Sequence, residues 1–241
     1  MAELSLYLDL LSQPCRSVYI FAKANNIPFQ FAEVRLFKGE QLGEDFAKVN
    51  AFCKVPALKD GDFTLSESIA ILLYLARKFN TSDHWYPSDL QKRARVDEYL
   101  AWQHTNTRLH GSKVFWAKHM SIILGQEVSS EKLDRVITEF NTTVTNLEKV
   151  FLADKPFLVG EEISIADLVA LVEIMQAVAG GLDVFEDRPK LAAWKQRVVE
   201  AVGEELFNEA HAQILNVKEQ NEAIAPEIVE ALKAKLVLYS S

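Results

Sequence analysis

Cysteine is scarce in this chain, which has only two, Cys15 and Cys53, among 241 residues. One pair cannot supply a disulfide framework, so the class of small disulfide-stapled secreted domains is excluded. The first residues also show no signal-like pattern. We therefore expect a protein that works in the reducing setting of the cytoplasm.

Long hydrophobic runs and an excess of positive charge are also missing. The longest apolar stretch, 69–76, is far shorter than the roughly 20 residues that a membrane span needs. The 34 acidic residues outnumber the 26 basic ones and give a net charge of −8, which argues against a nucleic-acid or anionic-membrane partner. With 49% hydrophobic residues, the chain can bury a sizeable core in one or two domains. We expect a soluble protein.

Internal repeats and low-complexity segments are absent, and the first 80 residues alternate strand and helix signals. A strand is predicted near 4–8, a helix from 14 to about 25, and a second strand from 28. Asp60-Gly61 indicates the turn of a hairpin, and Ser66 is the expected N-cap of the helix that follows it. The order β-α-β-(α)-β-β-α predicts a small α/β layer structure.

The composition changes at 81–90, where aperiodic polar and aromatic residues indicate a linker. Everything after it has helical periodicity. The predicted helices are 94–105, 133–151, 164–179, 189–202 and 226–239. We therefore predict an α/β domain followed by an all-α domain.

The most informative motif lies at 12–16, where the first strand turns into the first helix. It places a hydroxyl (Ser12), a helix-starting proline (Pro14) and a thiol (Cys15) at one helix N-terminus. Free backbone N–H groups and the positive end of the helix dipole favour an anion there. The motif therefore indicates a place that can hold a thiolate at neutral pH.

Two further segments each allow a structural and a functional interpretation. Pro56 interrupts a strand pattern. It indicates either a kinked edge strand or a cis Val55-Pro56 bond that turns the Val55 backbone outward to pair with an extended peptide ligand. Glu67 and Ser68 open the next helix. They either complement its dipole, or Ser68 binds a ligand carboxylate while Glu67 pairs with a ligand amine.

Together these segments are similar to a known family. Residues 8–16, 54–58 and 67–75 resemble the cytosolic glutathione transferases, and 94–104 with the serine-type first motif resembles the theta class. Residues 164–168 match the family's buried capping-box motif. The resemblance covers nearly the whole chain and is specific because the motifs occur in combination.

The resemblance implies a thioredoxin-like glutathione-binding domain at 1–80 and a linker at 81–90. It also implies an all-helical domain at 91–241, which carries the electrophile site and a covering C-terminal helix, and a homodimer. Reduced glutathione is then a co-substrate, with no permanently bound cofactor. The implied reaction is conjugation of glutathione to small electrophiles such as alkyl halides and epoxides, with reduction of organic hydroperoxides as a second activity.

The resemblance also assigns the glutathione contacts. Ser12 would donate a hydrogen bond to the glutathione sulfur, and Val55 would pair with the cysteinyl backbone. Glu67 and Ser68 would hold the γ-glutamyl end.

Four other residues complete the expected site. Gln41 and Lys54 would contact the glycyl carboxylate, and Arg108 would line the site or reach across the dimer. Lys235 lies on the apolar stripe of the last predicted helix. It either extends its amine to solvent or places a cation near an anionic substrate or leaving group.

Some alternatives remain open. Cys15 could itself act as a thiol-transfer nucleophile, although no C-x-x-C motif surrounds it and a buried helix residue is the simpler interpretation. A third hypothesis is that the protein is a non-catalytic ligand carrier or interaction module of the same fold. Tyr7 and the tryptophans are assigned to packing, and Ser164 with Asp167 to a folding role. The five histidines do not cluster, so no metal site is expected.

Overall fold

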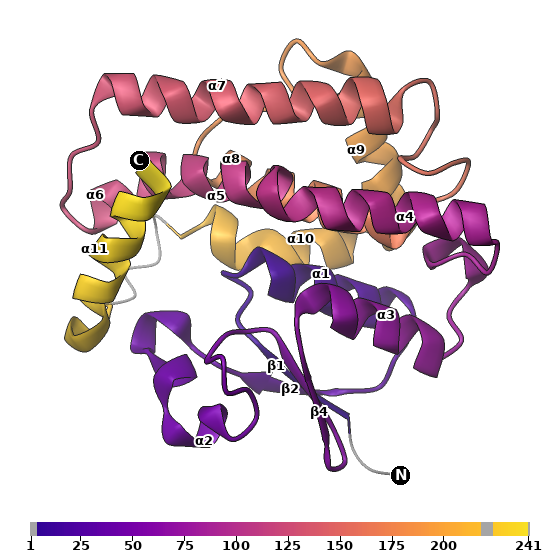
Figure 1. The fold of residues 1–241 in the computed structure, drawn as a ribbon, viewed down its shortest axis with the longest axis horizontal. Helices are drawn as coiled ribbons and strands as arrows, with labels where there is room; N and C mark the ends of the chain where they lie inside the picture. Colours follow the sequence, from indigo (N-terminus) through magenta and orange to yellow (C-terminus); the bar gives the residue numbers. More distant parts are fainter. Residues whose placement is uncertain (1–3, 218–223, 241) are drawn as a thin grey trace. The chain divides into compact units, whose positions relative to one another are not determined.

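The computed structural model describes residues 4–217 and 224–240 (Figure 1). Contacts group the chain into two compact units, 1–86 with 202–228, and 87–201 with 229–241. Among the described residues, no helix has both the length and the apolar character needed to cross a membrane.

The first unit contains a four-stranded mixed sheet. Its strands are β1 (Leu4–Leu8), β2 (Gln30–Glu33), β3 (Ala57–Asp60) and β4 (Phe63–Ser66). They lie in the order β2-β1-β3-β4, with β1 parallel to β2 and antiparallel to β3. In β1, Leu4, Leu6 and Leu8 are buried and alternate with less buried neighbours. This is the period-two pattern of a strand that packs one face against a hydrophobic core. The predicted hairpin is confirmed, with Gly61 at φ 62° in its turn.

Helices and 3-10 turns complete this unit. They are α1 (Gln13–Ala24), α2 (Glu44–Ala47), α3 (Ser68–Lys78) and α10 (Glu204–Leu215), with 3-10 turns η1 (Leu36–Lys38), η2 (Glu40–Leu42) and η3 (Asp83–Trp85). In Figure 1, α1 and α3 lie together on one face of the sheet. α10 packs against α1, and the Tyr19 hydroxyl donates to Glu209 at 2.7 Å. This contact explains why 202–228 belong to the first unit.

The second unit is helical. It holds α4 (Leu90–Trp102), η4 (Gln103–Thr105), α5 (Thr107–Phe115), α6 (Ser121–Ile123), α7 (Ser130–Asn146), α8 (Ile165–Ala179), α9 (Pro189–Val202), most of α11 (Pro226–Ser240), and two π-helical turns, η5 (Trp116–Met120) and η6 (Leu147–Leu152). α8 is buried along nearly its whole length and packs against α4 and α5. A helix that is apolar all round belongs in the interior, which is where α8 lies.

The predicted capping box opens α8. Asp167 is fully buried, and its Oδ2 accepts from the Ser164 N–H at 3.0 Å and from the Ser164 hydroxyl at 2.9 Å. Its Oδ1 accepts from the Leu158 N–H at 2.7 Å and the Trp194 indole N–H at 2.9 Å. Burial raises the pKa of the Asp167 carboxyl. The predicted capping box is confirmed, and the Asp167 carboxylate also links α8 to Leu158 and to Trp194 of α9.

Other expectations need correction. Ser66 does not cap α3, because it pairs with Ala57 as the last residue of β4. The cap position is Glu67, whose side chain makes no capping hydrogen bond. The helices α5, α6 and α10 were missed. The division into domains at 81–90 stays a prediction, and the compact units differ from it in where 202–228 belong.

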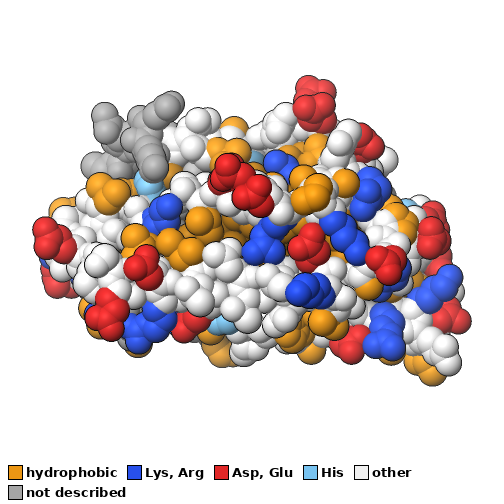
Figure 2. Space-filling view, turned by 90° about the horizontal axis from the view of Figure 1, so that it is seen from above, with side chains coloured by type: hydrophobic (Ala, Val, Ile, Leu, Met, Phe, Trp, Pro, Cys, Tyr) orange, Lys and Arg blue, Asp and Glu red, His pale blue; other side chains and the backbone are white. Residues whose placement is uncertain are grey.

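The molecular surface mixes charges of both signs. On the face in Figure 2, Lys and Arg side chains lie between Asp and Glu side chains, with hydrophobic groups among them. No unbroken basic patch covers the described part of that face.

Candidate functional site in the sheet unit

Strand register brings four predicted segments to one end of the sheet. Tyr7 pairs with Ala57, and Ala57 pairs with Ser66. The turn after β1, the segment before β3 and the segment after β4 therefore lie at the same end. β2 runs parallel to β1, so the loop after β2 reaches that end as well. Six of the predicted residues lie in these segments: Ser12, Gln41, Lys54, Val55, Glu67 and Ser68.

Ser12 is the N-cap residue of α1, with extended backbone at φ −86° and ψ 121°. Its hydroxyl makes no capping hydrogen bond with α1, although it lies within hydrogen-bonding reach of the Cys15 thiol. The side chain is half-buried. The Ser12 side chain therefore does not cap α1, and the N-terminus of a helix favours an anion.

Asp9 shapes this turn and was not singled out from the sequence. The residue is 4% exposed. Its Oδ1 accepts from the Leu11 N–H at 2.9 Å, and its Oδ2 accepts from the Leu36 N–H at 2.8 Å. The Ser12 N–H donates to the Asp9 carbonyl at 2.9 Å. Asp9 therefore joins the Ser12 turn to the loop after β2. An aspartate at the end of a strand, where Asx turns form, is the signal that could have found it.

Cys15 is enclosed in the core. It is fully buried, and burial raises the pKa of its thiol to about 12. Desolvation thus outweighs the hydrogen bonds from Asp9 and Ser12, which lower the pKa, and burial favours the neutral thiol. Tyr7 packs against Val34, Phe46 and Ala57, with ring centroids 5.9 Å apart for Tyr7 and Phe46. The packing role assigned to Tyr7 is confirmed.

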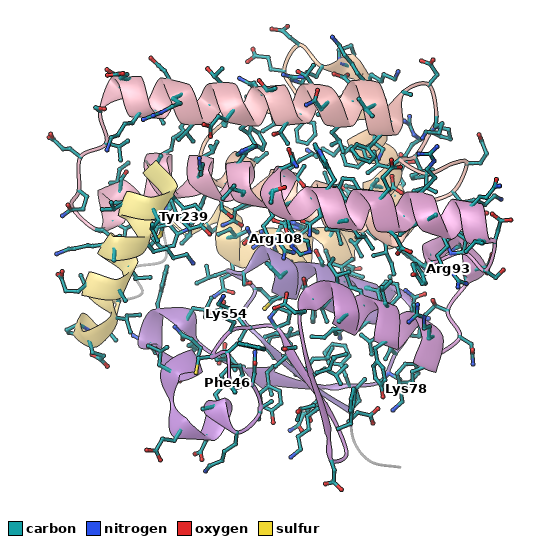
Figure 3. The ribbon with its side chains drawn as sticks, viewed as in Figure 1. Phe46, Lys54, Lys78, Arg93, Arg108 and Tyr239 are labelled. Carbon is teal, nitrogen blue, oxygen red and sulfur yellow. The ribbon has the colours of Figure 1, made fainter. Side chains whose placement is uncertain are left out.

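The segment before β3 contains the cis peptide bond that one of the two interpretations of Pro56 requires. The Val55-Pro56 bond is cis. Within the described chain, no hydrogen bond from the Val55 backbone is found. Asn50 orders the preceding turn: its Nδ2 donates to the Lys54 carbonyl at 2.7 Å, and its Oδ1 accepts from the Phe52 N–H at 3.0 Å. Lys54, labelled in Figure 3, is exposed. Asn50 is a second structural residue that the sequence did not reveal.

Glu67 has an uncommon backbone conformation. Its φ is 69° and its ψ 112°, and its side chain is exposed. Positive φ at a non-glycine residue is costly and clusters at ligand-binding sites. Ser68 begins α3 and is 3% exposed. α3 also has no side-chain N-cap hydrogen bond, and the N-terminus of a helix favours an anion.

Gln41 lies on η2 in the loop after β2 and is half-buried. Its Oε1 is buried without a hydrogen-bond partner among the described residues. The loop is braced by Glu40, which accepts from the Arg35 backbone N–H and Nε, both at 2.8 Å.

Arg108 and Lys235 lie in the helical unit. Arg108, labelled in Figure 3, donates from Nε to Oε1 of the fully buried Glu173 at 2.8 Å. Lys235 is exposed on α11, with Nζ 4.9 Å from the Trp116 ring centroid and 5.7 Å from that of Tyr239. The two rings stack at 5.7 Å. Trp116 was assigned to packing alone, so its contact with the Lys235 cation was missed.

Comparisons with known proteins agree with this arrangement. Residues 12–78 match the model of the glutathione S-transferase N-terminal domain, and residues 113–201 match that of the C-terminal domain. The chain is 52% identical to chicken glutathione S-transferase theta-1, over 97% of this chain and 98% of the chicken protein. The chain belongs to the theta class of glutathione S-transferases.

Solved structures extend the theta-class likeness to the fold. Apo human glutathione-S-transferase T1-1 superposes with a TM-score of 0.94 at 55% identity, covering 99% of this chain and 100% of the human one. A human theta-class transferase in complex with the glutathione conjugate of 1-menaphthyl sulfate gives 0.93 at 45% identity, with 98% of both chains covered. The expected thioredoxin-like α/β domain followed by an all-helical domain is confirmed, and so is the resemblance to the theta class.

Proposed function

We propose that this transferase conjugates reduced glutathione to small electrophiles such as alkyl halides and epoxides. The observation that carries the proposal is the convergence of the Ser12 turn, Val55 and the Glu67-Ser68 pair at one end of the sheet. Two helices without side-chain N-caps begin there. The human relative that holds a glutathione conjugate supports the same reaction class.

Glutathione brings the nucleophile, so the protein has to stabilise a thiolate and position it. The Ser12 hydroxyl donates to the sulfur, and a charge-assisted hydrogen bond is worth about 1.5–3 kcal/mol. The N-terminus of α1 adds about 0.3–1 kcal/mol. Together they lower the pKa of the bound thiol by about one to three units from roughly 8.5. Ser12 acts as a donor and therefore needs no base.

The remaining contacts hold the tripeptide. The outward backbone of Val55 pairs with the cysteinyl unit, as a strand edge pairs with an extended peptide. Glu67 binds the γ-glutamyl amine, and Ser68 with the N-terminus of α3 binds its carboxylate. Lys54 and Gln41 contact the glycyl carboxylate. No permanently bound cofactor takes part in this scheme.

Arg108 and Lys235 form the cationic part of the electrophile site. The buried Glu173 carboxylate fixes the Arg108 guanidinium, and the Trp116 and Tyr239 rings fix the Lys235 ammonium. Two fixed cations favour substrates that carry or release an anion, such as halide or sulfate.

We further propose that the same site reduces organic hydroperoxides. The glutathione thiolate attacks the terminal peroxide oxygen, the O–O bond breaks, and the alkoxide leaves and is protonated to the alcohol. A second glutathione then reduces the resulting glutathione sulfenic acid, which yields glutathione disulfide and water. We further propose a homodimer and a cytoplasmic location, as the family resemblance and the scarcity of cysteine suggest.

Binding and turnover measured together separate this function from its alternatives. We expect glutathione to bind in calorimetry and an alkyl halide and an epoxide to be conjugated. Binding without turnover would favour a ligand carrier, and absence of glutathione binding would overturn the proposal. Thiol transfer by Cys15 is disfavoured because its thiol is buried and its pKa is raised to about 12.

Lys235→Ala should lower turnover of an anionic electrophile about 2- to 5-fold relative to a neutral one, the modest size expected of a solvent-exposed cation. The measurement is the ratio of kcat/KM for the two substrates. Lys233→Ala is the matched control, because Lys233 lies on the same helix and pairs with Glu230 at 2.8 Å. An unchanged ratio in Lys235→Ala would remove Lys235 from the electrophile site.

A further inference from the structure

The start of α11 contacts the loop that carries Gln41, and both segments belong to the first unit. The Ala225 N–H donates to the Phe37 carbonyl on η1 at 2.9 Å. This hydrogen bond joins the C-terminal part of the chain to the loop after β2.

A second contact lies two residues further along the loop. Gly39 separates η1 from η2 with φ 73°. A Cβ built on Gly39 would lie only 2.9 Å from Cγ2 of Ile228, which is 3% exposed. Ile228 therefore rests directly on the Gly39 backbone, where only glycine leaves room and adopts this φ without strain.

These two contacts add to hydrogen bonds that hold the loop at residues preceding Gly39. Asp9 accepts the Leu36 N–H, and Glu40 braces Arg35. Gly39 is the turn from which η2 and Gln41 follow. Gln41 lies on η2, two residues after the Ile228 contact, and its Nε2 is the side-chain atom that can donate to a carboxylate.

We propose that Ala225–Ile228 positions Gln41, with Ile228 as the positioning residue, so that the C-terminal helix sets the affinity for the glycyl end of glutathione. This inference rests on the proposed contact between Gln41 and the glycyl carboxylate. A loop held from one side samples more conformations, and ordering it on binding costs affinity. With Ile228 in place, the loop is already ordered before glutathione binds, so binding does not have to supply the free energy of ordering it.

The test compares glutathione with γ-glutamylcysteine, which lacks the glycyl residue. Ile228→Ala should weaken glutathione binding about 2- to 10-fold, the range of one net hydrogen bond, and leave γ-glutamylcysteine binding unchanged. Leu236→Ala is the matched control: Leu236 lies on the same helix, is also 3% exposed, and does not contact Gly39. It should affect both ligands equally or neither.

Gly39→Ala disturbs the same contact from the loop side and should give the same glycine-specific loss. Gly125→Ala controls for backbone strain, because Gly125 has φ 62° with no atom within 4 Å of an added Cβ. Equal weakening of both ligands in Ile228→Ala, or an Ile228-like pattern in Leu236→Ala, would overturn the positioning role.

Gln41→Ala distinguishes two negative outcomes: either Ile228 does not position Gln41, or Gln41 does not contact the glycyl carboxylate. If Gln41→Ala shows the glycine-specific loss and Ile228→Ala does not, Gln41 binds glycine without help from α11. If Gln41→Ala shows no glycine-specific loss, the proposed Gln41 contact is wrong and the inference falls with it.

Discussion

Replacing Ser12 with alanine should lower kcat/KM near neutral pH by about 10- to 100-fold, because the bound sulfur loses a charge-assisted hydrogen bond worth about 1.5–3 kcal/mol. Each 1.4 kcal/mol corresponds to about one pKa unit of the bound thiol. The midpoint of the pH–rate profile should therefore rise by about one to two units, and much of the activity should return at high pH. Steady-state kinetics over a pH series measures both effects.

Three comparisons make this result specific. Ser12→Thr keeps a hydroxyl and should recover part of the rate. Calorimetric affinity for glutathione, measured at a pH low enough to keep the bound thiol protonated, should change little in Ser12→Ala, since the tripeptide is held by other residues. Cys15→Ala should keep the wild-type pH profile, because that thiol is buried and neutral. Activity that disappears in Cys15→Ala and survives in Ser12→Ala would assign the chemistry to Cys15 instead.

The elements that the sequence revealed are those whose signals are local. The alternation of Leu4, Leu6 and Leu8 predicts β1 from adjacent residues. The Ser164 and Asp167 spacing predicts a capping box within one helical turn. The motif at Ser12 lies at a strand–helix junction that its neighbours define. In each case the determining contacts are only a few residues apart, so one segment of sequence contains them.

Residues whose partners are distant in sequence escaped prediction. Asp9 orients the Ser12 turn through Leu36, 27 positions away, and Glu173 fixes Arg108 over 65 positions. A single sequence carries no sign of such pairs before the fold is known. Ser66 shows the opposite error: its residue type suits a helix cap, but pairing with Ala57 in the sheet determines its conformation.

Distant partners also determine how much stability a substitution of Asp167 should remove. From the sequence, Asp167 is one half of a capping box, and loss of a cap costs about 1 kcal/mol. In the structure its buried carboxylate also accepts the Leu158 N–H and the Trp194 indole N–H. Removing it leaves several buried donors without an acceptor, each costing about 1–3 kcal/mol.

Asp167→Ala should therefore lower the free energy of unfolding by about 3–5 kcal/mol and Tm by about 6–20 °C, at about 2–4 °C per kcal/mol for a chain of this size. Urea and thermal unfolding followed by circular dichroism measure both quantities. Asp89→Ala is the matched control: Asp89 is an exposed N-cap whose Oδ1 accepts from the Gln91 and Lys92 N–H groups, so about 1 kcal/mol is expected. Equal losses in the two variants would mean that the Leu158 and Trp194 bonds add nothing, and that Asp167 acts as an ordinary helix cap.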